Sequence, residues 1–238
     1  MIMKKNLGFL MSLFVVSLLV ASCDINVKKS ISVDEPTITV VNELKDYERV
    51  VVEAACNVKF IQSDESKVKI KGTQSDLKRV SYDVEDGVLY IRYGERKGVR
   101  MLKLRDMGAV DVELYSPDLV GIELRGAGEV KVEDLDTDTL TLDMRGAGNV
   151  RMKNIICDRI EAQLKGAGEI RIDSLEAEWA DIQLKGVGNV EVGFVNSGYA
   201  KCSLQGVGNV KLHGQVRKLE RETKGTGNVD VSQLKVGE

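Results

Sequence analysis

The residues most suggestive of chemistry are six short strings, each Gly-x-Gly followed by Asn or Glu and then Val or Ile. Glycine lets backbone amides approach an anion, so such strings could bind phosphate. None carries the third glycine or the Gly-Lys-Ser/Thr of nucleotide loops, and each precedes a strand-like run rather than a helix. We therefore expect the glycines to form tight corners. The strings begin at Gly126, Gly146, Gly166, Gly186, Gly206 and Gly225.

Basic residues stand just before and just after these strings. At the repeat spacing they would form two outward ladders along one edge, with neighbours about 4.8 Å apart. The acidic neighbours Glu123 and Asp143 give way to neutral residues in later repeats. We therefore expect an uncompensated stripe at Lys165, Arg171 and Lys185 that binds an anionic glycan or lipopolysaccharide. The candidate residues for this anionic-ligand stripe are Arg125, Arg145, Arg151, Lys165, Arg171 and Lys185.

Catalytic and metal-binding sets are sparse. The single histidine, His213, removes most zinc sites and imidazole-dependent nucleophiles. Asp134, Asp136 and Asp138 alternate within one repeat but lack the glycine and distal glutamate of an EF-hand loop. The formal net charge of −3 creates no overall field that would favour nucleic acid. We expect no catalytic residue, metal, cofactor or nucleic-acid partner.

Residues 1–22 have the features of a bacterial lipoprotein signal peptide. Lys4 and Lys5 form the positive region, and Leu7–Val20 is apolar but short for a membrane span. The segment ends in Leu-Val-Ala-Ser before Cys23, which resembles a lipobox. We expect Cys23 to carry a lipid anchor and residues 23–36 to include a flexible tether. The protein would then lie in the cell envelope, with the outer membrane favoured over the inner.

Three cysteines remain in the expected oxidising compartment, which gives no even disulfide framework. Cys202 replaces an aliphatic residue of the repeat, and Cys157 would lie two coils away from it, too far to bridge. Two short motifs, Asp138-Thr139-Leu140 and Asp173-Ser174-Leu175, resemble acceptors of bacterial periplasmic O-glycosylation.

The glycine strings recur at a nearly constant interval of about 20 residues, a period typical of solenoids. Between them apolar and polar residues alternate, which predicts short strands. The expected fold is an all-β, right-handed parallel β-helix over 37–238, with one coil for each repeat. Residues 121–238 would hold six regular repeats, and 37–120 would form irregular opening coils or a separate small β domain.

Inward residues of successive coils should stack into columns. Arg221 and Thr223 fall in otherwise apolar columns, so the last coil should serve as a polar cap. Two columns precede the glycines: Ile122, Leu142, Ala162, Ile182, Cys202, and Leu124, Met144, Leu164, Leu184, Leu204. Two follow them: Val130, Val150, Ile170, Val190, Val210, Val229, and Val132, Met152, Ile172, Val192, Leu212, Val231. A third side carries Leu135, Ile155, Leu175, Val195, then Leu140, Ile160, Ala180, Ala200.

These features resemble the bacterial head GIN domain family, described as a putative autotransporter adhesin. The resemblance covers about residues 47–230, through the Val50–Ile61 run, the Asp86–Ile91 segment, Ser116–Leu119 and the glycine strings. It implies an exported, often lipid-anchored, right-handed β-helix and no defined binding residues. We therefore expect a non-enzymatic adhesion or binding module. A carbohydrate-active enzyme and a purely structural envelope protein are the alternatives.

Overall fold

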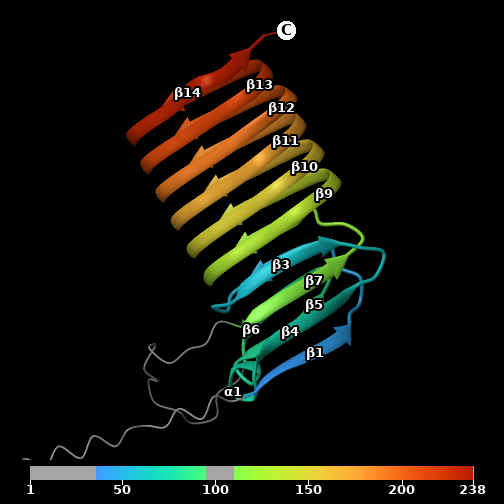
Figure 1. Cartoon of the computed structure of the whole chain (residues 1–238). Helices are drawn as coiled ribbons and strands as arrows, with labels where there is room; N and C mark the ends of the chain where they lie inside the picture. The colour runs from blue at the N-terminus through green and yellow to red at the C-terminus, as the bar shows by residue number, and fades with distance from the viewer. Residues whose placement is uncertain (1–35, 95–109, 238) are drawn as a thin grey trace, which may run out of the picture. The chain divides into compact units, whose positions relative to one another are not determined.

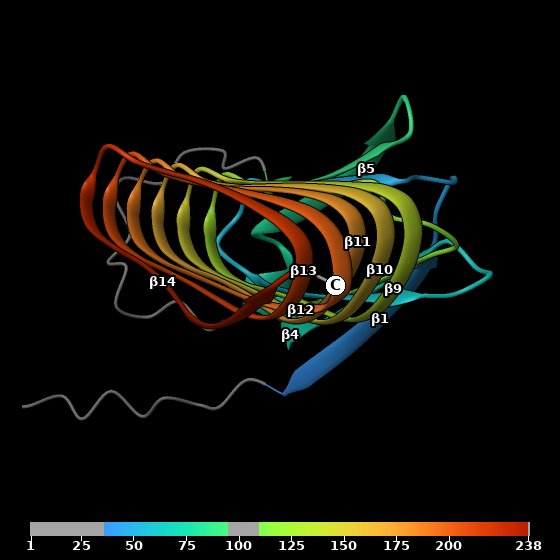
Figure 2. The same ribbon diagram turned by 90° about the horizontal axis from the view of Figure 1, so that it is seen from above.

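The computed structural model describes residues 36–94 and 110–237. Its strands form one continuous sheet that winds into stacked coils (Figure 1), and seen from above the coils superpose as flattened loops (Figure 2). This architecture confirms the predicted all-β solenoid. The regular coils consist of β9 (Ala127–Met144), β10 (Ala147–Leu164), β11 (Ala167–Leu184), β12 (Val187–Leu204), β13 (Val207–Thr223) and β14 (Thr226–Val236).

These strands pair in parallel, and through β9–β12 most residues pair with their counterparts one repeat away. Alternate residues point inward, so each apolar position meets its counterpart in the next coil. Leu164, for example, pairs with Met144 on one side and Leu184 on the other, and all three are fully buried. Each Gly-x-Gly string forms a turn that we call the glycine corner. The predicted columns on the two sides that flank this corner form the core almost throughout. Val231, at the end of one column, is only partly buried.

The glycine corner explains why each repeat keeps both glycines. A Cβ on Gly146 would lie 1.9 Å from the carbonyl oxygen of Gly126, and a Cβ on Gly148 would lie 1.9 Å from that of Gly128. Gly148 also has a φ of 152°, and the equivalent glycines of the other repeats have φ between 129° and 148°. Both glycine positions of the corner are thus closed to side chains by contact with the preceding coil.

The third side of the coil departs from the expected column. Val195 was expected to follow Leu175, and this is wrong: Phe194 pairs with Leu175 and is buried, whereas Val195 is 48% exposed. The strand register shifts by one residue here and returns before the next corner. Asn196, with a left-handed φ of 48°, lies within this irregularity, and asparagine tolerates that conformation better than most residues.

The predicted polar positions of the final repeat are in register with the columns below them. Arg221 pairs with Cys202 and Thr223 pairs with Leu204, and both polar side chains are exposed. Polar residues at these two positions therefore end the two apolar columns that precede the glycines, as expected for a cap.

Described strands within residues 49–93 and 111–124 form coils that are stacked out of chain order. β2 (Arg49–Val52) pairs in parallel with both β6 (Val88–Tyr93) and β8 (Gly121–Leu124). β3 (Asn57–Gln62) likewise pairs with β7 (Asp111–Ser116) and β9. The first coil of the chain is therefore placed between a later coil and the regular repeats.

Antiparallel strands accompany these coils, which the sequence did not predict. β4 (Lys67–Thr73) pairs with β7, β1 (Thr37–Glu43) pairs with β4, and β5 (Val80–Glu85) pairs with β6. β1 ends the main strand order. In the described part of the chain the helical element α1 (Gln74–Leu77) is a single turn, and no helix there is long and apolar enough to cross a membrane.

Candidate functional site

Two ladders of outward residues flank the glycine corner, as the repeat spacing predicts. The pre-turn ladder is held by backbone bonds from each member to the preceding coil, and the post-turn ladder by strand pairing. The pre-turn ladder consists of Arg125, Arg145, Lys165, Lys185, Gln205 and Lys224. The post-turn ladder consists of Lys131, Arg151, Arg171, Glu191 and Lys211.

The corner between the ladders offers no amides to an anion. The backbone N–H groups of Arg145 and Gly146 donate to the carbonyl of Leu124 at 2.9 and 2.8 Å, and that of Ala147 donates to Gly126 at 3.1 Å. Because these donors already bond the preceding coil, the glycine strings have a structural role here.

Acidic side chains compensate the first cations of the pre-turn ladder. Arg125 contacts Glu53 at 2.7 Å and Glu123 at 2.8 Å. The hydrogen bonds that Arg125 donates to these carboxylates, with Glu123 contributing most, raise the pKa of Arg125. Arg145 lies 3.1 Å from Glu123 and 2.8 Å from Asp143. Each guanidinium thus bridges two carboxylates, one of them from a neighbouring coil.

The expectation that the basic stripe is uncompensated is wrong at Lys165. Its Nζ reaches back one coil to Asp143, at 2.9 Å. Burial raises the pKa of Asp143, but bonds from Arg145 and Lys165 outweigh burial and lower the pKa below its usual value. The side chain of Lys185, by contrast, has no ion pair or hydrogen bond to any described residue. Lysine side chains are long enough to reach an adjacent coil, which sequence spacing alone did not reveal.

The expectation is also wrong at Arg171, in the post-turn ladder. Its guanidinium contacts Asp173 at 2.6 Å and Glu191 of the next coil at 2.9 Å. Arg151 similarly lies 3.1 Å from Glu129 of the preceding coil. Ion pairs of this exposed kind contribute little to stability, but they neutralise the ladder locally.

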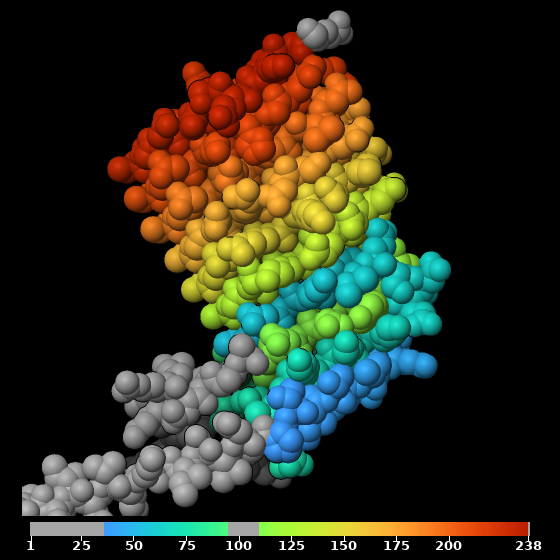
Figure 3. Space-filling model, viewed as in Figure 1, coloured from blue at the N-terminus to red at the C-terminus, as the bar shows by residue number. Residues whose placement is uncertain are grey.

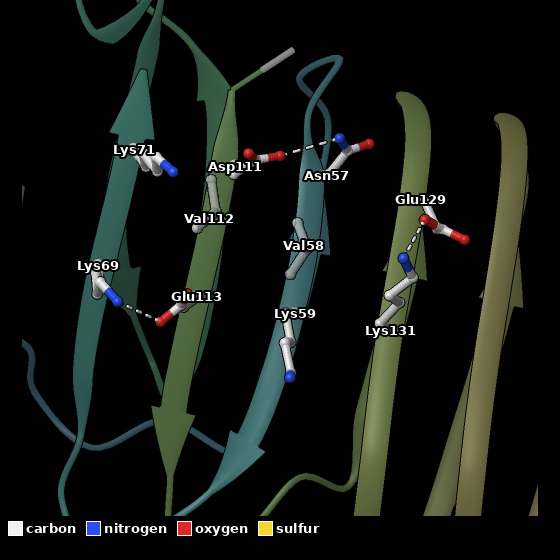
Figure 4. A pocket seen from close by; sticks show the side chains of 10 residues that line it. All are labelled: Asn57, Val58, Lys59, Lys69, Lys71, Asp111, Val112, Glu113, Glu129 and Lys131. Atoms are coloured by element: carbon white, nitrogen blue, oxygen red, sulfur yellow. Dashed lines mark hydrogen bonds and ion pairs between the residues drawn. The ribbon is translucent and has the colours of Figure 1, made fainter. Parts of the chain in front are cut away.

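The post-turn ladder continues onto the opening coils. Lys59 pairs in register with Lys131 on one side and with Glu113 on the other, and Glu113 bonds Lys69 at 3.0 Å. A shallow depression of about 290 Å³ lies here (Figure 4). Lys71 points into it without an ion pair to any described residue. Its lining residues are Asn57, Val58, Lys59, Lys69, Lys71, Asp111, Val112, Glu113, Glu129 and Lys131.

An aromatic stack on the strands before the glycine corner was missed by the sequence analysis. Trp179 and Tyr199 are strand partners in adjacent coils, with ring centroids 6.3 Å apart and planes at 24°. The guanidinium of Arg159 lies 3.6 Å from the Trp179 centroid, and the Lys218 ammonium lies 5.5 Å from that of Tyr199. The spacing of one repeat between Trp179 and Tyr199 was the signal that could have revealed this stack.

The stack borders rows of polar side chains that also project outward. One row joins Asp181 to Lys201, and the next joins Gln163 to Gln183. The side chain of Gln163 has no hydrogen-bond partner among the described residues, whereas the Gln183 side chain donates to Asp181 at 2.9 Å. We call this surface the tryptophan face. It comprises Arg159, Glu161, Gln163, Lys165, Trp179, Asp181, Gln183, Lys185, Tyr199, Lys201 and Gln205.

The remaining candidate residues do not form a reactive site. Cys56, Cys157 and Cys202 are buried free thiols, and burial raises the pKa of each to about 12. Within residues 36–94 and 110–237, no group of three His, Cys, Asp or Glu side chains could hold a metal ion. Cys23 lies outside the described residues.

The two short glycosylation motifs lie within strands β9 and β11. Thr139 is exposed beside the aromatic stack, in register with Arg159, and Ser174 is partly exposed. Glycosylation of either residue stays a prediction.

Comparison with known proteins places the chain in a family. A profile described as "Putative auto-transporter adhesin, head GIN domain" matches residues 46–190 and 169–238. A crystal structure of a "putative adhesin" from Bacteroides fragilis is 22% identical, with a TM-score of 0.66, over 82% of this chain and 96% of that one. A "putative lipid binding protein" from Parabacteroides distasonis is 15% identical, with a TM-score of 0.59, over 85% and 96%. No curated protein matches the sequence. These structures share the fold, and the profile match shows that the chain belongs to the head GIN domain family of auto-transporter adhesin-like proteins.

Proposed function

We propose that this protein is a non-enzymatic adhesion or binding module of the cell envelope, anchored to the membrane through a lipid on Cys23. Its ligand is an extended glycan that lies along the tryptophan face. The observation that carries this proposal is the position of Trp179, the single tryptophan of the chain, on an outward strand surface among rows of hydrogen-bonding side chains. Membership of an adhesin-like family supports a binding role.

The chemistry of the face favours hydroxyl-rich ligands. Carboxylate, amide and ammonium groups from Asp181, Gln183 and Lys201 are of the kinds that exchange hydrogen bonds with sugar hydroxyls. Trp179 supplies an indole N–H that has no acceptor among the described residues. Because Arg159 and Tyr199 cover the two faces of the indole ring, the ligand meets its edge. A repetitive strand surface without a deep pocket suits a polymer more than a small molecule.

The charges of the tryptophan face favour acidic glycans, but through fewer cations than the basic stripe expected from the sequence. Within the tryptophan face Lys185 is the cation whose ammonium group has neither an ion pair nor a hydrogen bond to the described residues, whereas Lys165 is neutralised by Asp143. An acidic sugar would therefore pair first with Lys185. Since this contact is exposed, its contribution should weaken with salt, which screens charges over about 10 Å at 0.1 M.

The single tryptophan permits a direct test. Glycans identified on an array are titrated into the protein while tryptophan fluorescence is recorded, and binding at the tryptophan face should change its intensity or wavelength. Calorimetry should then show that Trp179→Ala weakens binding at least about fivefold, because losing an interface aromatic commonly costs more than about 1 kcal/mol. Tyr93→Ala, which removes an exposed aromatic outside this face, is the matched control.

Charge is tested with a second matched pair. Lys185→Glu should weaken acidic-glycan binding, whereas Lys71→Glu, a change at another lysine without an ion pair, should not. Glycan binding that leaves tryptophan fluorescence unchanged and is unaffected by Trp179→Ala would mean that the binding site lies outside the tryptophan face. Triple substitution of Lys165, Arg171 and Lys185 by Glu reports on the stripe as a whole. Shortening of the glycan during incubation, measured by chromatography, would favour the carbohydrate-active enzyme instead.

A further inference from the structure

Strand β1 is an edge strand that the described part of the chain leaves uncovered. It pairs with β4 alone, and all seven of its residues are exposed. In Figure 3 β1 is the outermost blue band of the viewed face. An edge of this kind presents a row of unpaired backbone N–H and C=O groups, which is a template for another strand.

The residues of β1 continue an apolar surface past the end of the core. Val40 lies opposite Ile70 of β4, so their side chains share a face. Ile70 is 4% exposed, whereas Val40 is 37% exposed and its neighbour Ile38 is 39% exposed. The apolar face of the sheet therefore extends one strand beyond the residues that cover it.

β1 also lacks the features that usually protect an edge strand. These are a lysine or proline within the strand, a bulge, or a very short length. Its seven residues include neither lysine nor proline, and its register with β4 runs unbroken from Thr37 to Glu43. Glu43, at the last position, is the strand's one charged residue.

We propose that β1 pairs with the β1 strand of a second copy, in antiparallel orientation about a two-fold axis. Pairing along the whole strand places Val40 opposite its own copy, and Ile38 opposite Asn42 of the partner strand. Glu43 then faces Thr37 rather than another carboxylate, so no like charges oppose each other. The same patch serves both copies, as a two-fold interface requires. This self-complementarity favours a second copy over an unrelated partner, and the proposal is independent of the glycan site.

The register can be tested by oxidative cross-linking of the full chain in a Cys23→Ser background. Val40→Cys should form a disulfide-linked dimer, since directly opposite strand residues lie about 4.5–5.5 Å apart. Ile38→Cys, on the same face and similarly exposed, is the matched control. Its two copies would be offset along the strands by about 13 Å and should not cross-link. The three native thiols described are buried and should not contribute.

Association itself is measured by sedimentation of the same Cys23→Ser chain. Val40→Lys would place two ammonium groups opposite each other and should raise the dimer dissociation constant at least about tenfold. Val207→Lys, at an exposed valine of the glycine corner, should leave it unchanged. Thermal melting checks that both variants fold. A monomer at every concentration up to about 1 mM, or a dimer indifferent to Val40→Lys in the folded variant, overturns the proposal.

Discussion

The two glycines of each repeat serve different requirements at the same corner. The first has no space for a side chain, because the carbonyl of the preceding coil lies where its Cβ would be. The second has the same restriction and also a positive φ. The alternating pattern Gly-x-Gly therefore records two backbone constraints, while the exposed middle position varies freely between Ala, Val and Thr.

Gly168→Ala should lower the free energy of unfolding by at least about 2 kcal/mol. The new Cβ would lie 1.8 Å from the carbonyl oxygen of Gly148, and φ is 142°. Denaturant unfolding measures the loss. Ala167→Val, the substitution found naturally at position 187, is the control and should change stability by less than about 0.5 kcal/mol. Equal effects of the two changes would contradict the corner geometry.

The buried thiols make a second residue-scale prediction. At pH 8 a pKa of about 12 leaves only about one thiolate in ten thousand, so a maleimide should not label Cys56, Cys157 or Cys202 in the folded protein. Unfolding in guanidinium should expose all three, which mass spectrometry can count. Because the pKa of the thiol in the folded protein exceeds the ordinary value of 9.0, the stability gained by burying the protonated thiol is present below pH 9. It is lost as the pH rises toward about 12. Rapid labelling of the native protein would contradict this burial.

At the scale of the strands, the constant period predicted the regular coils because each inward position contacts its own counterpart. It could not predict contacts that depend on distant segments. Val58 of β3 pairs with Val130 of β9, although β4 to β8 lie between them in the chain, and nothing in the local pattern of either strand records that partner. Phe194 likewise replaced Val195 in the core through a register shift that a strict period cannot anticipate.

Excision of Gly146–Lys165 should leave a folded, shorter solenoid. The deletion joins Arg145 to Gly166, so the next coil meets the preceding one in the same register, and stability depends mainly on neighbouring repeats. Excision of Gly146–Ile155 alone would instead bring the third side of one coil against the glycine corner of another. Thermal melting should show a cooperative transition for the first deletion and its loss for the second. Equal tolerance of both would count against stacked coils.

At the scale of the whole molecule, the surface charges balance locally, and this is why the basic stripe could be misjudged from the sequence. Spacing placed Lys165 and Arg171 correctly on their ladders. Spacing did not predict that flexible side chains reach carboxylates one coil away. The tryptophan face was missed for a related reason, since it is a relation among three strands, and each strand shows only one of Arg159, Trp179 and Tyr199.

Attachment of the whole molecule to a membrane through a lipid on Cys23 is a prediction. Cys23→Ser should move the protein from the membrane fraction to the soluble fraction, because each buried methylene of a lipid anchor contributes about 0.8 kcal/mol and several chains together give stable attachment. Cys157→Ser is the matched control: it alters a buried thiol of the solenoid and should leave the protein on the membrane. Metabolic labelling with palmitate should follow the same division, with incorporation lost in Cys23→Ser alone. Membrane attachment that survives Cys23→Ser would instead assign anchoring to the solenoid surface, and the tryptophan face would then have to be tested against lipid vesicles before glycans.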